Sequence, residues 1–297
     1  MLKGLAITPP VVGRISIGRV IERNGKRLPE KDDQFTLTTQ IQHHDGWVLH
    51  PLDETMREAS NGKLRAIPVR LMFNDPNLNL RAEFSAFEKE TGRPICVGNG
   101  DTCRRAVNNA IETLPCPSPE ACEFGLKRCK PYGRLNVLVG EDDELGSFIF
   151  RTTSFNSIRT LAARLNYYHA LSGGLLATMP LELKLRGKST TQSYRSAIYY
   201  VDLVVRSGMS LESAIAQARE LADRKKAAGL DQTALDDAAR MGFANGAFED
   251  SADEAPEVVE EFYPTSPPAS DPGTSMIPPD NPSLNDKLKA KADKLIN

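Results

Sequence analysis

The segment Phe35-Thr36-Leu37-Thr38-Thr39-Gln40-Ile41 alternates apolar and polar residues and is rich in β-branched side chains. A period of two is typical of a strand with one buried side and one solvent-facing side. Upstream, Asn24-Gly25 is a dipeptide that favours the tight turn of a β-hairpin, and residues 11–21 have the composition of its first strand. The N-terminal part of the chain therefore predicts antiparallel β-structure.

Similar patterns continue along the chain. Leu181, Leu183 and Leu185 alternate with charged residues, which predicts another strand with one apolar side. Further strands are expected at residues 64–73, 80–87, 135–139, 147–151 and 198–205. The sequence thus predicts an α+β protein that is mostly antiparallel β, and an OB-like barrel is one form the strands could take.

A few helices interrupt this pattern. Ser154 is a suitable N-cap for a helix whose apolar positions Ile158, Leu161, Leu165 and Tyr168 recur at helical spacing. A second helix is expected at residues 210–227, with basic residues at its C-terminal end, and a third at residues 232–243. Residues 207–246 are accordingly expected to form a helical segment after a β-rich core domain at residues 1–206.

The C-terminal residues 247–297 differ in composition from this core. Between Met241 and Asp286 there are ten acidic residues and no Lys or Arg, and Pro and Ser are frequent. Such a segment buries too little apolar area to offset its ordering entropy, so we expect a disordered acidic tail with a short basic helix at residues 284–295. Residues 1–240 carry a net charge of +5, from 33 basic and 28 acidic side chains. A mildly basic body with an acidic tail is compatible with nucleic-acid binding.

The chain has no apolar run long enough to cross a membrane and no recognisable signal peptide. We therefore expect a cytoplasmic protein that does not bind membranes. No pair of a nucleophile and a base stands out in the sequence, so no catalytic residue is predicted.

All five cysteines fall between residues 96 and 129 with the spacing C-x6-C-x12-C-x5-C-x6-C. In a reducing compartment, clustered thiols favour a metal over disulfides. We predict a structural Zn²⁺ site of four thiolates within an insert at residues 96–134. The expected ligands are Cys103, Cys116, Cys122 and Cys129, with Cys96 as a possible substitute.

Basic residues occur in the same window and again near residue 190, where they could contact phosphates or a protein partner. The candidates for nucleic-acid or partner binding are Arg104, Arg105, Lys127, Arg128, Lys130, Arg134, Lys184, Arg186, Lys188, Tyr194 and Arg195. The run Gly187-Lys188-Ser189-Thr190 lacks the first glycine of a phosphate-binding loop, since Glu182 stands there, so it is better interpreted as part of a basic hairpin.

Several runs together carry a family resemblance. They are Arg65-Ala66-Ile67-Pro68-Val69-Arg70-Leu71, Cys96-Val97-Gly98-Asn99-Gly100, the spaced cysteines, Cys129-Lys130-Pro131-Tyr132-Gly133-Arg134-Leu135 and Phe150-Arg151-Thr152-Thr153-Ser154-Phe155-Asn156-Ser157-Ile158-Arg159. With these runs, residues 3–206 resemble the recombination directionality factor-like proteins of phages and integrative mobile elements, whose relatives often carry the label hydrolase or metal-binding protein. The resemblance implies a non-catalytic accessory protein that binds a serine integrase on DNA and switches it from integration to excision.

Two other functions remain open from the residues alone. A β-rich body with a zinc insert and a basic hairpin also suits a single-stranded DNA-binding protein. A metal-dependent hydrolase is the weaker alternative, because four thiolates would leave no open metal position for a water molecule.

Overall fold

The computed structural model describes residues 10–23, 26–43, 46–108, 110–126, 128–140, 146–189 and 197–243. The chain divides into two units, Met1–Pro264 and Thr265–Asn297, and all of the described residues belong to the first. The predicted disordered tail and its terminal helix lie outside the described residues. No helix within the described ranges is long and apolar enough to cross a membrane.

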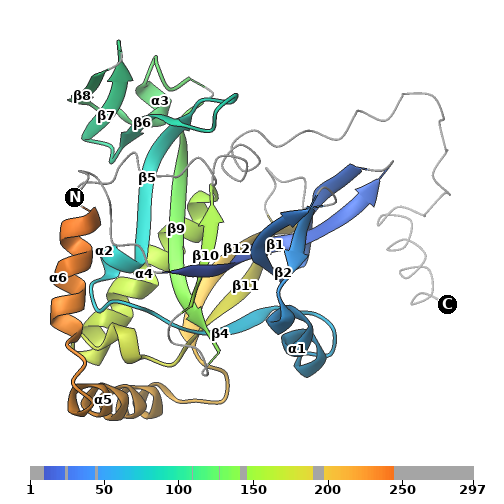
Figure 1. The fold of residues 1–297 in the computed structure, drawn as a ribbon, viewed down its shortest axis with the longest axis vertical. Helices are drawn as coiled ribbons and strands as arrows, with labels where there is room; N and C mark the ends of the chain where they lie inside the picture. Colours follow the sequence, from blue (N-terminus) through green and yellow to red (C-terminus); the bar gives the residue numbers. More distant parts are fainter. Residues whose placement is uncertain are drawn as a thin grey trace, which may run out of the picture. The chain divides into compact units, whose positions relative to one another are not determined.

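Within the described ranges, twelve strands form one branched sheet (Figure 1). They are β1 (Val11–Arg23), β2 (Lys26–His43), β3 (Gly46–Leu49), β4 (Ala66–Arg70), β5 (Leu80–Phe87), β6 (Pro94–Gly98), β7 (Thr102–Val107), β8 (Ala110–Pro115), β9 (Lys130–Val139), β10 (Ser147–Thr152), β11 (Leu181–Ser189) and β12 (Ala197–Val205). The helices are α1 (Pro51–Ala59), α2 (Pro76–Asn79), α3 (Ser118–Ala121), α4 (Phe155–Ser172), α5 (Leu211–Ala227) and α6 (Gln232–Phe243), with a 3-10 turn, η1, at Leu176–Thr178. The protein is therefore mixed α+β, as predicted.

The main path of the sheet runs β3-β2-β1-β10-β9-β5-β6-β7-β8. All of its pairs are antiparallel except β1 with β10, which is parallel. At the end of β9, Val139 pairs with Val69 of β4, and β4 leads on to β11 and β12. The sheet thus splits at β9 instead of curling back on itself. Among the described strands no pairing closes a barrel, so the expectation of an OB-like barrel is wrong.

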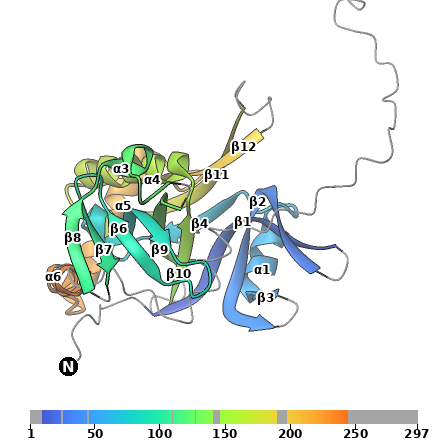
Figure 2. The same cartoon turned by 90° about the horizontal axis from the view of Figure 1, so that it is seen from above.

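Two long hairpins extend from this sheet, β1–β2 and β11–β12 (Figure 2). The β1–β2 hairpin has the predicted pairing, down to Arg23 with Lys26, although Asn24 and Gly25 lie outside the described residues. In β11, Leu181 and Leu183 are fully buried, which confirms the predicted apolar side of this strand.

Helix α4 packs on β12, β9 and β5 and covers the main core. Its predicted N-cap is confirmed, because Ser154 accepts a hydrogen bond from the Ser157 amide. Gly173 ends the helix in the left-handed conformation. The predicted stripe is inward, with Leu161 and Leu165 almost completely buried. This helix thereby joins the two branches of the sheet.

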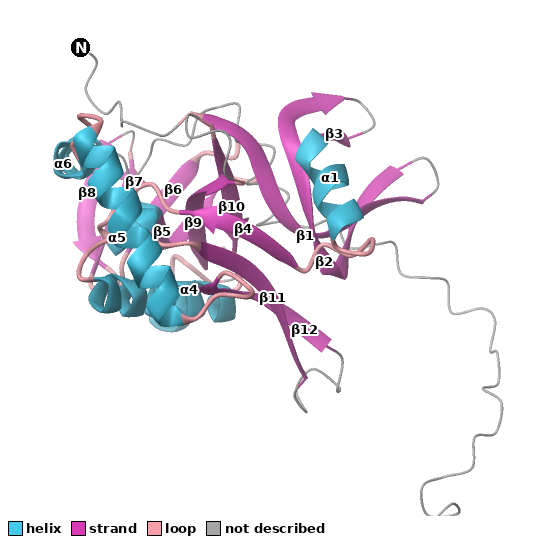
Figure 3. Ribbon diagram, turned by 90° about the horizontal axis from the view of Figure 1, so that it is seen from below, coloured by secondary structure: helices cyan, strands magenta, loops and turns pink. Residues whose placement is uncertain are grey.

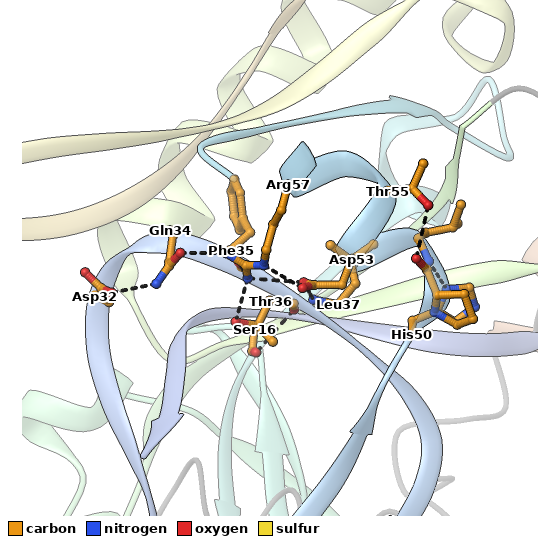
Figure 4. A network of polar contacts seen from close by, with 12 residues as sticks. Ser16, Asp32, Gln34, Phe35, Thr36, Leu37, His50, Asp53, Thr55 and Arg57 are labelled. Atoms are coloured by element: carbon orange, nitrogen blue, oxygen red, sulfur yellow. Dashed lines mark hydrogen bonds and ion pairs between the residues drawn. The ribbon is translucent and has the colours of Figure 1, made fainter. Parts of the chain in front are cut away.

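Helix α1 is attached on the other side of the molecule, away from α4, α5 and α6 (Figure 3). Its attachment is polar (Figure 4). The buried Asp53 accepts from the Leu37 amide at 2.8 Å and pairs with Arg57 Nε at 2.5 Å. Arg57 also donates to the Phe35 carbonyl at 2.7 Å and to Gln34 Oε1 at 2.6 Å. This network holds α1 against β2, the strand that contains Phe35 and Leu37.

Helix α6 is attached to the loop before α2. The Asp236 carboxylate accepts hydrogen bonds from the amides of Asn74 and Asp75, and Arg240 pairs with Asp75 at 3.0 Å. A small separate apolar cluster of Phe73, Leu78 and Ala239 lies beneath these bonds. The predicted helical segment after residue 206 is therefore packed against the β-rich body.

Candidate functional site: a thiol cluster and two basic surfaces

The five cysteines lie in one substructure, which we call the cysteine module and define as residues 94–129. It consists of the antiparallel strands β6, β7 and β8, the short helix α3 and the loop that returns to β9. The module stands at one end of β5 and β9 (Figure 1). The insert was predicted from the sequence, but β7 and β8 were not, because their residues have little apolar alternation.

Two glycines mark where the cysteines approach one another. A Cβ at Gly98 would lie 2.7 Å from Cys103 Cβ and 2.9 Å from Cys116 Sγ. A Cβ at Gly125 would lie 2.9 Å from Cys129 Cβ and 3.4 Å from Cys122 Sγ. Real Cβ atoms rarely come this close, so both positions require glycine for the thiols to gather.

All five cysteines are free thiols. Burial, followed by the neighbouring Cys96, raises the pKa of Cys103 to about 11. Burial and the surrounding thiols raise the pKa of Cys129 to about 12; among these thiols Cys96 has the strongest effect and Cys103 the weakest. As they stand, no three His, Cys, Asp or Glu side chains of the described ranges are placed to hold a metal ion. The predicted zinc site therefore remains a prediction.

Arg105 connects two of these thiols. In the β6–β7 register it lies opposite Cys96, and its Nη2 donates to Cys122 Sγ at 3.7 Å. Its guanidinium also stacks over the Phe124 ring at 4.1 Å, with Arg128 at 5.8 Å from the same ring. Arg105 is thus placed to offset negative charge on the sulfurs, and Arg128 remains exposed.

The other basic residues predicted near the cysteines differ in exposure. Arg104 and Lys130 are half-buried, and Lys127 lies outside the described residues. Arg134 is buried in β9, where it pairs with Glu83 at 3.1 Å. A buried guanidinium that already has a carboxylate partner is poorly placed to contact a phosphate. The half-buried and exposed cations Arg104, Arg128 and Lys130 remain as candidates here.

The second predicted basic group lies on the β11–β12 hairpin. Lys184 pairs with Glu182 at 3.5 Å, and Arg186 pairs with Asp202 at 3.3 Å. Lys188 donates to Asn156 Oδ1 at 2.8 Å and lies over the Tyr200 ring. Tyr194 and Arg195 fall outside the described residues.

The structure adds a residue that sequence reasoning missed. Arg164 of α4 shares the Asp202 carboxylate with Arg186, at 3.0 Å, and both side chains are 45% exposed. We call Arg164 of α4, with Arg186 and Lys188 of β11, the α4–β12 basic surface, because Arg164 and Arg186 share the buried Asp202 carboxylate of β12. Lys188 contacts Asn156 and Tyr200 instead. Arg164 lies on the polar side of α4, so the helical pattern of the sequence gives no sign of its role. Only the packing of α4 against β12 brings it to Asp202.

Between the module and this surface lies the start of α4. The exposed ring of Phe155 borders a small, mostly apolar cavity of about 90 Å³, which Asn99 of the module also lines. A larger cavity of about 250 Å³ lies against α5 and is lined by three arginines, Arg70, Arg206 and Arg224, and by Glu220. Neither cavity contains a nucleophile beside a base among its lining residues.

Comparison with known proteins gives one match. A family model described as Gp3-like, recombination directionality factor-like, matches residues 12–206. No curated protein and no solved structure matches the chain. The matched residues include the whole cysteine module, α4 and the β11–β12 hairpin.

Proposed function

The chain belongs to the recombination directionality factor-like family, and from this we propose that it is a non-catalytic accessory protein that binds a serine integrase-type recombinase and controls excision. The family assignment supports a role in phage DNA recombination. Its match over residues 12–206 is the observation that carries the proposal. The same assignment is consistent with a non-enzymatic role and gives no support to the hydrolase alternative.

The matched residues suggest where the partner and DNA would bind. They end before α5 and α6, so the surfaces common to the family lie on the sheet, the cysteine module and α4. On α4, Phe155 and Tyr167 are more than half exposed. Exposed aromatic side chains of this kind are enriched in protein interfaces. We therefore place the integrase contact on the exposed side of α4.

The α4–β12 basic surface adjoins this helix and is our proposed DNA contact. Arg164 and Arg186 share one carboxylate, which leaves net positive charge at their exposed side chains. Such a surface attracts phosphates without reading base sequence. Lys188 and the Tyr200 ring beside it extend the surface along the hairpin.

Single-stranded DNA binding is the second candidate function, and the same surface supports it. A cation next to an aromatic ring is the arrangement by which bases stack and backbones bind in single-strand binding proteins. The OB-like barrel that first suggested this function is not present among the described strands. The candidate therefore depends on the α4–β12 surface alone.

The decisive experiment uses the full chain and a purified serine integrase encoded by the same mobile element. We expect the chain to permit recombination of the excision substrates and to inhibit recombination of the integration substrates. An unchanged direction, together with no measurable binding to that integrase, would overturn the proposal. Tight, strongly salt-dependent single-stranded DNA binding in the absence of integrase would instead favour the second candidate.

A pair of matched variants separates the DNA contact from general charge. Arg186→Ala with Lys188→Ala removes two cations of the proposed surface, whereas Arg219→Ala with Lys226→Ala removes two exposed cations of α5. We expect only the first variant to weaken DNA binding, by about tenfold or more if both phosphate contacts are lost. Equal effects of the two variants would show that the surface has no specific role.

A further inference from the structure

We propose that the cavity of about 250 Å³ beside α5 binds the phosphate group of a small phosphomonoester through Arg70, Arg206 and Arg224. The three arginines come from separate parts of the chain. Arg70 ends β4, Arg206 directly follows β12, and Arg224 lies in the last turn of α5. The α5 residues of the cavity follow residue 206, where the family match ends. The site is therefore distinct from the surfaces proposed for recombination and does not depend on that role.

The backbone around the cavity is held in place by buried structure. Val69, next to Arg70, is fully buried and pairs with Leu181 of β11. The Arg206 amide donates to the Pro180 carbonyl at 3.1 Å, and the Arg206 carbonyl accepts from the Met209 amide at 3.2 Å. Helix α5 packs on the main core through fully buried alanines. The arginines thus extend from fixed positions, and a preorganised site loses less conformational freedom when a ligand binds.

Two of the arginines lie deep in the cavity. Arg70 and Arg206 are half-buried, and the Nε atom of each is buried, whereas Arg224 is exposed at the rim. Among the described residues that line the cavity, Glu220 is the one carboxylate, so the lining carries a net charge of +2. Cations that share a partly desolvated space repel one another, and a bound anion removes that cost. The cavity therefore favours an anionic ligand.

A phosphomonoester matches this cavity better than other common anions. It carries a charge of about −1.5 to −2 at pH 7 and three terminal oxygens. Each guanidinium can donate two parallel hydrogen bonds to such oxygens. A carboxylate has one charge and two oxygens, and a backbone phosphate of DNA also has one charge. The cavity volume is below the roughly 300 Å³ at which pockets for drug-sized ligands begin, so the ligand is small.

The test is isothermal titration calorimetry of the full chain in a buffer without phosphate. The probes are inorganic phosphate and a nucleoside 5′-monophosphate. We expect at least one of them to bind with a Kd below about 1 mM, within the usual range of substrate affinities, and the parent nucleoside not to bind. No binding of either probe at about this concentration would end the proposal.

Matched variants test the arginines. Arg206→Gln and Arg224→Gln should each weaken binding of the phosphate probe by about tenfold or more, because each loses hydrogen bonds between charged groups. The control is Arg219→Gln, at an exposed position of α5 that does not line the cavity, and it should bind as the wild-type protein does. An equal loss in the control would mean that the probe responds only to the overall charge of α5.

Two further measurements do not depend on a loss of binding. Glu220→Gln removes the negative charge from the lining, so it should bind the phosphate probe several-fold more tightly, which a poorly folded variant cannot do. Weaker binding by a folded Glu220→Gln protein would contradict an anion site. A duplex oligonucleotide without terminal phosphates should leave the bound nucleotide in place. Displacement of the nucleotide by this DNA would instead assign the arginines to backbone contacts and reject the small ligand.

Discussion

The β-rich body and the cysteine module are parts of one sheet but are stabilised in different ways. Among the described residues, the main apolar cluster of the body has 24 buried members, drawn from both branches of the sheet, α4 and α5. The cluster at the module has three buried members within the described residues, Ala86 of β5 and the cysteines Cys96 and Cys103. Burying one large apolar side chain contributes about 1.5–3 kcal/mol, so apolar burial stabilises the body far more than the module. Regions of one sheet can thus depend on different chemistry.

The largest expected effect tests the body. Phe150 of β10 is 1% exposed in the main cluster. Phe150→Ala should lower the free energy of unfolding by about 3–5 kcal/mol, because it removes a buried ring and leaves a cavity. Urea unfolding followed by circular dichroism measures the change. The control Ile41→Ala, at an exposed position of β2, should stay near the wild-type value.

A similar loss for both substitutions would mean that the apolar cluster does not hold the body together. If a metal chelator left the free energy of unfolding of the wild-type body unchanged, it would also show that the body does not depend on zinc.

The second-largest effect is expected from breaking the polar attachment of α1 to the body. Asp53→Ala leaves the Arg57 guanidinium and the Leu37 amide without their shared partner. We expect a loss of about 3 kcal/mol, since breaking one side of a mostly buried ion pair costs more than the pair contributes. Thermal unfolding checks this, with Asp237→Ala as the exposed control. A stability equal to that of the control would contradict the role of the network.

The third prediction is specific to the module. Gly98→Ala would place a methyl group against Cys103 Cβ and Cys116 Sγ. We expect a destabilisation of about 1–3 kcal/mol that is confined to the module, because the collision is local. Hydrogen exchange should show faster exchange of amides in β6–β8 and unchanged protection in β9 and β10. The control is Ile111→Ala on the exposed side of β8.

Uniform loss of protection in the body as well would mean that the module and the body unfold as one unit. The body and the module would then differ in composition but would not unfold independently of each other.

The same comparison explains what could be predicted from the sequence. In the body, the alternation at Leu181 and Leu183 and the cap at Ser154 act over a few residues, so strands and helices were predictable. The parallel pairing of Val11 with Ser147 and the branch at Val139 join residues far apart in sequence, so neither left a local pattern. The expectation of a closed barrel was wrong because these long-range pairings cannot be inferred from local sequence patterns.

Local patterns also failed in parts of the candidate site. The crowding of cysteines was visible in the sequence, but their partners were not, because the hydrogen bond of Cys103 depends on how β7 pairs with β8. Arg164 belongs to the basic surface only because it donates a hydrogen bond to Asp202 of β12, a residue distant in sequence. Helix α1 was not predicted, although it has local signals in the sequence: Pro51 in its first turn and the pair Asp53 and Arg57 four residues apart.

The smallest effect concerns the start of that helix. His50 Nδ1 accepts a hydrogen bond from the Leu52 amide at 3.2 Å, and burial lowers the pKa of His50 below its usual 6.5. The unfolded chain therefore binds a proton at His50 more readily than the folded chain. The stability that neutral His50 contributes is complete above about pH 6.5 and is lost as pH falls through the lower pKa of the folded state.

The variant His50→Asn keeps a hydrogen-bond acceptor at the cap but does not titrate. Between about pH 8 and pH 5 its free energy of unfolding should therefore fall less than that of the wild-type protein. The difference should be a fraction of the roughly 1 kcal/mol that a helix cap contributes. Urea midpoints at the two pH values measure the difference, and an identical fall in both proteins would assign the pH dependence to other groups. The cysteine module contains no histidine. A confirmed difference between the two proteins would therefore show that the attachment of α1 makes the stability of the body, and not of the module, sensitive to pH.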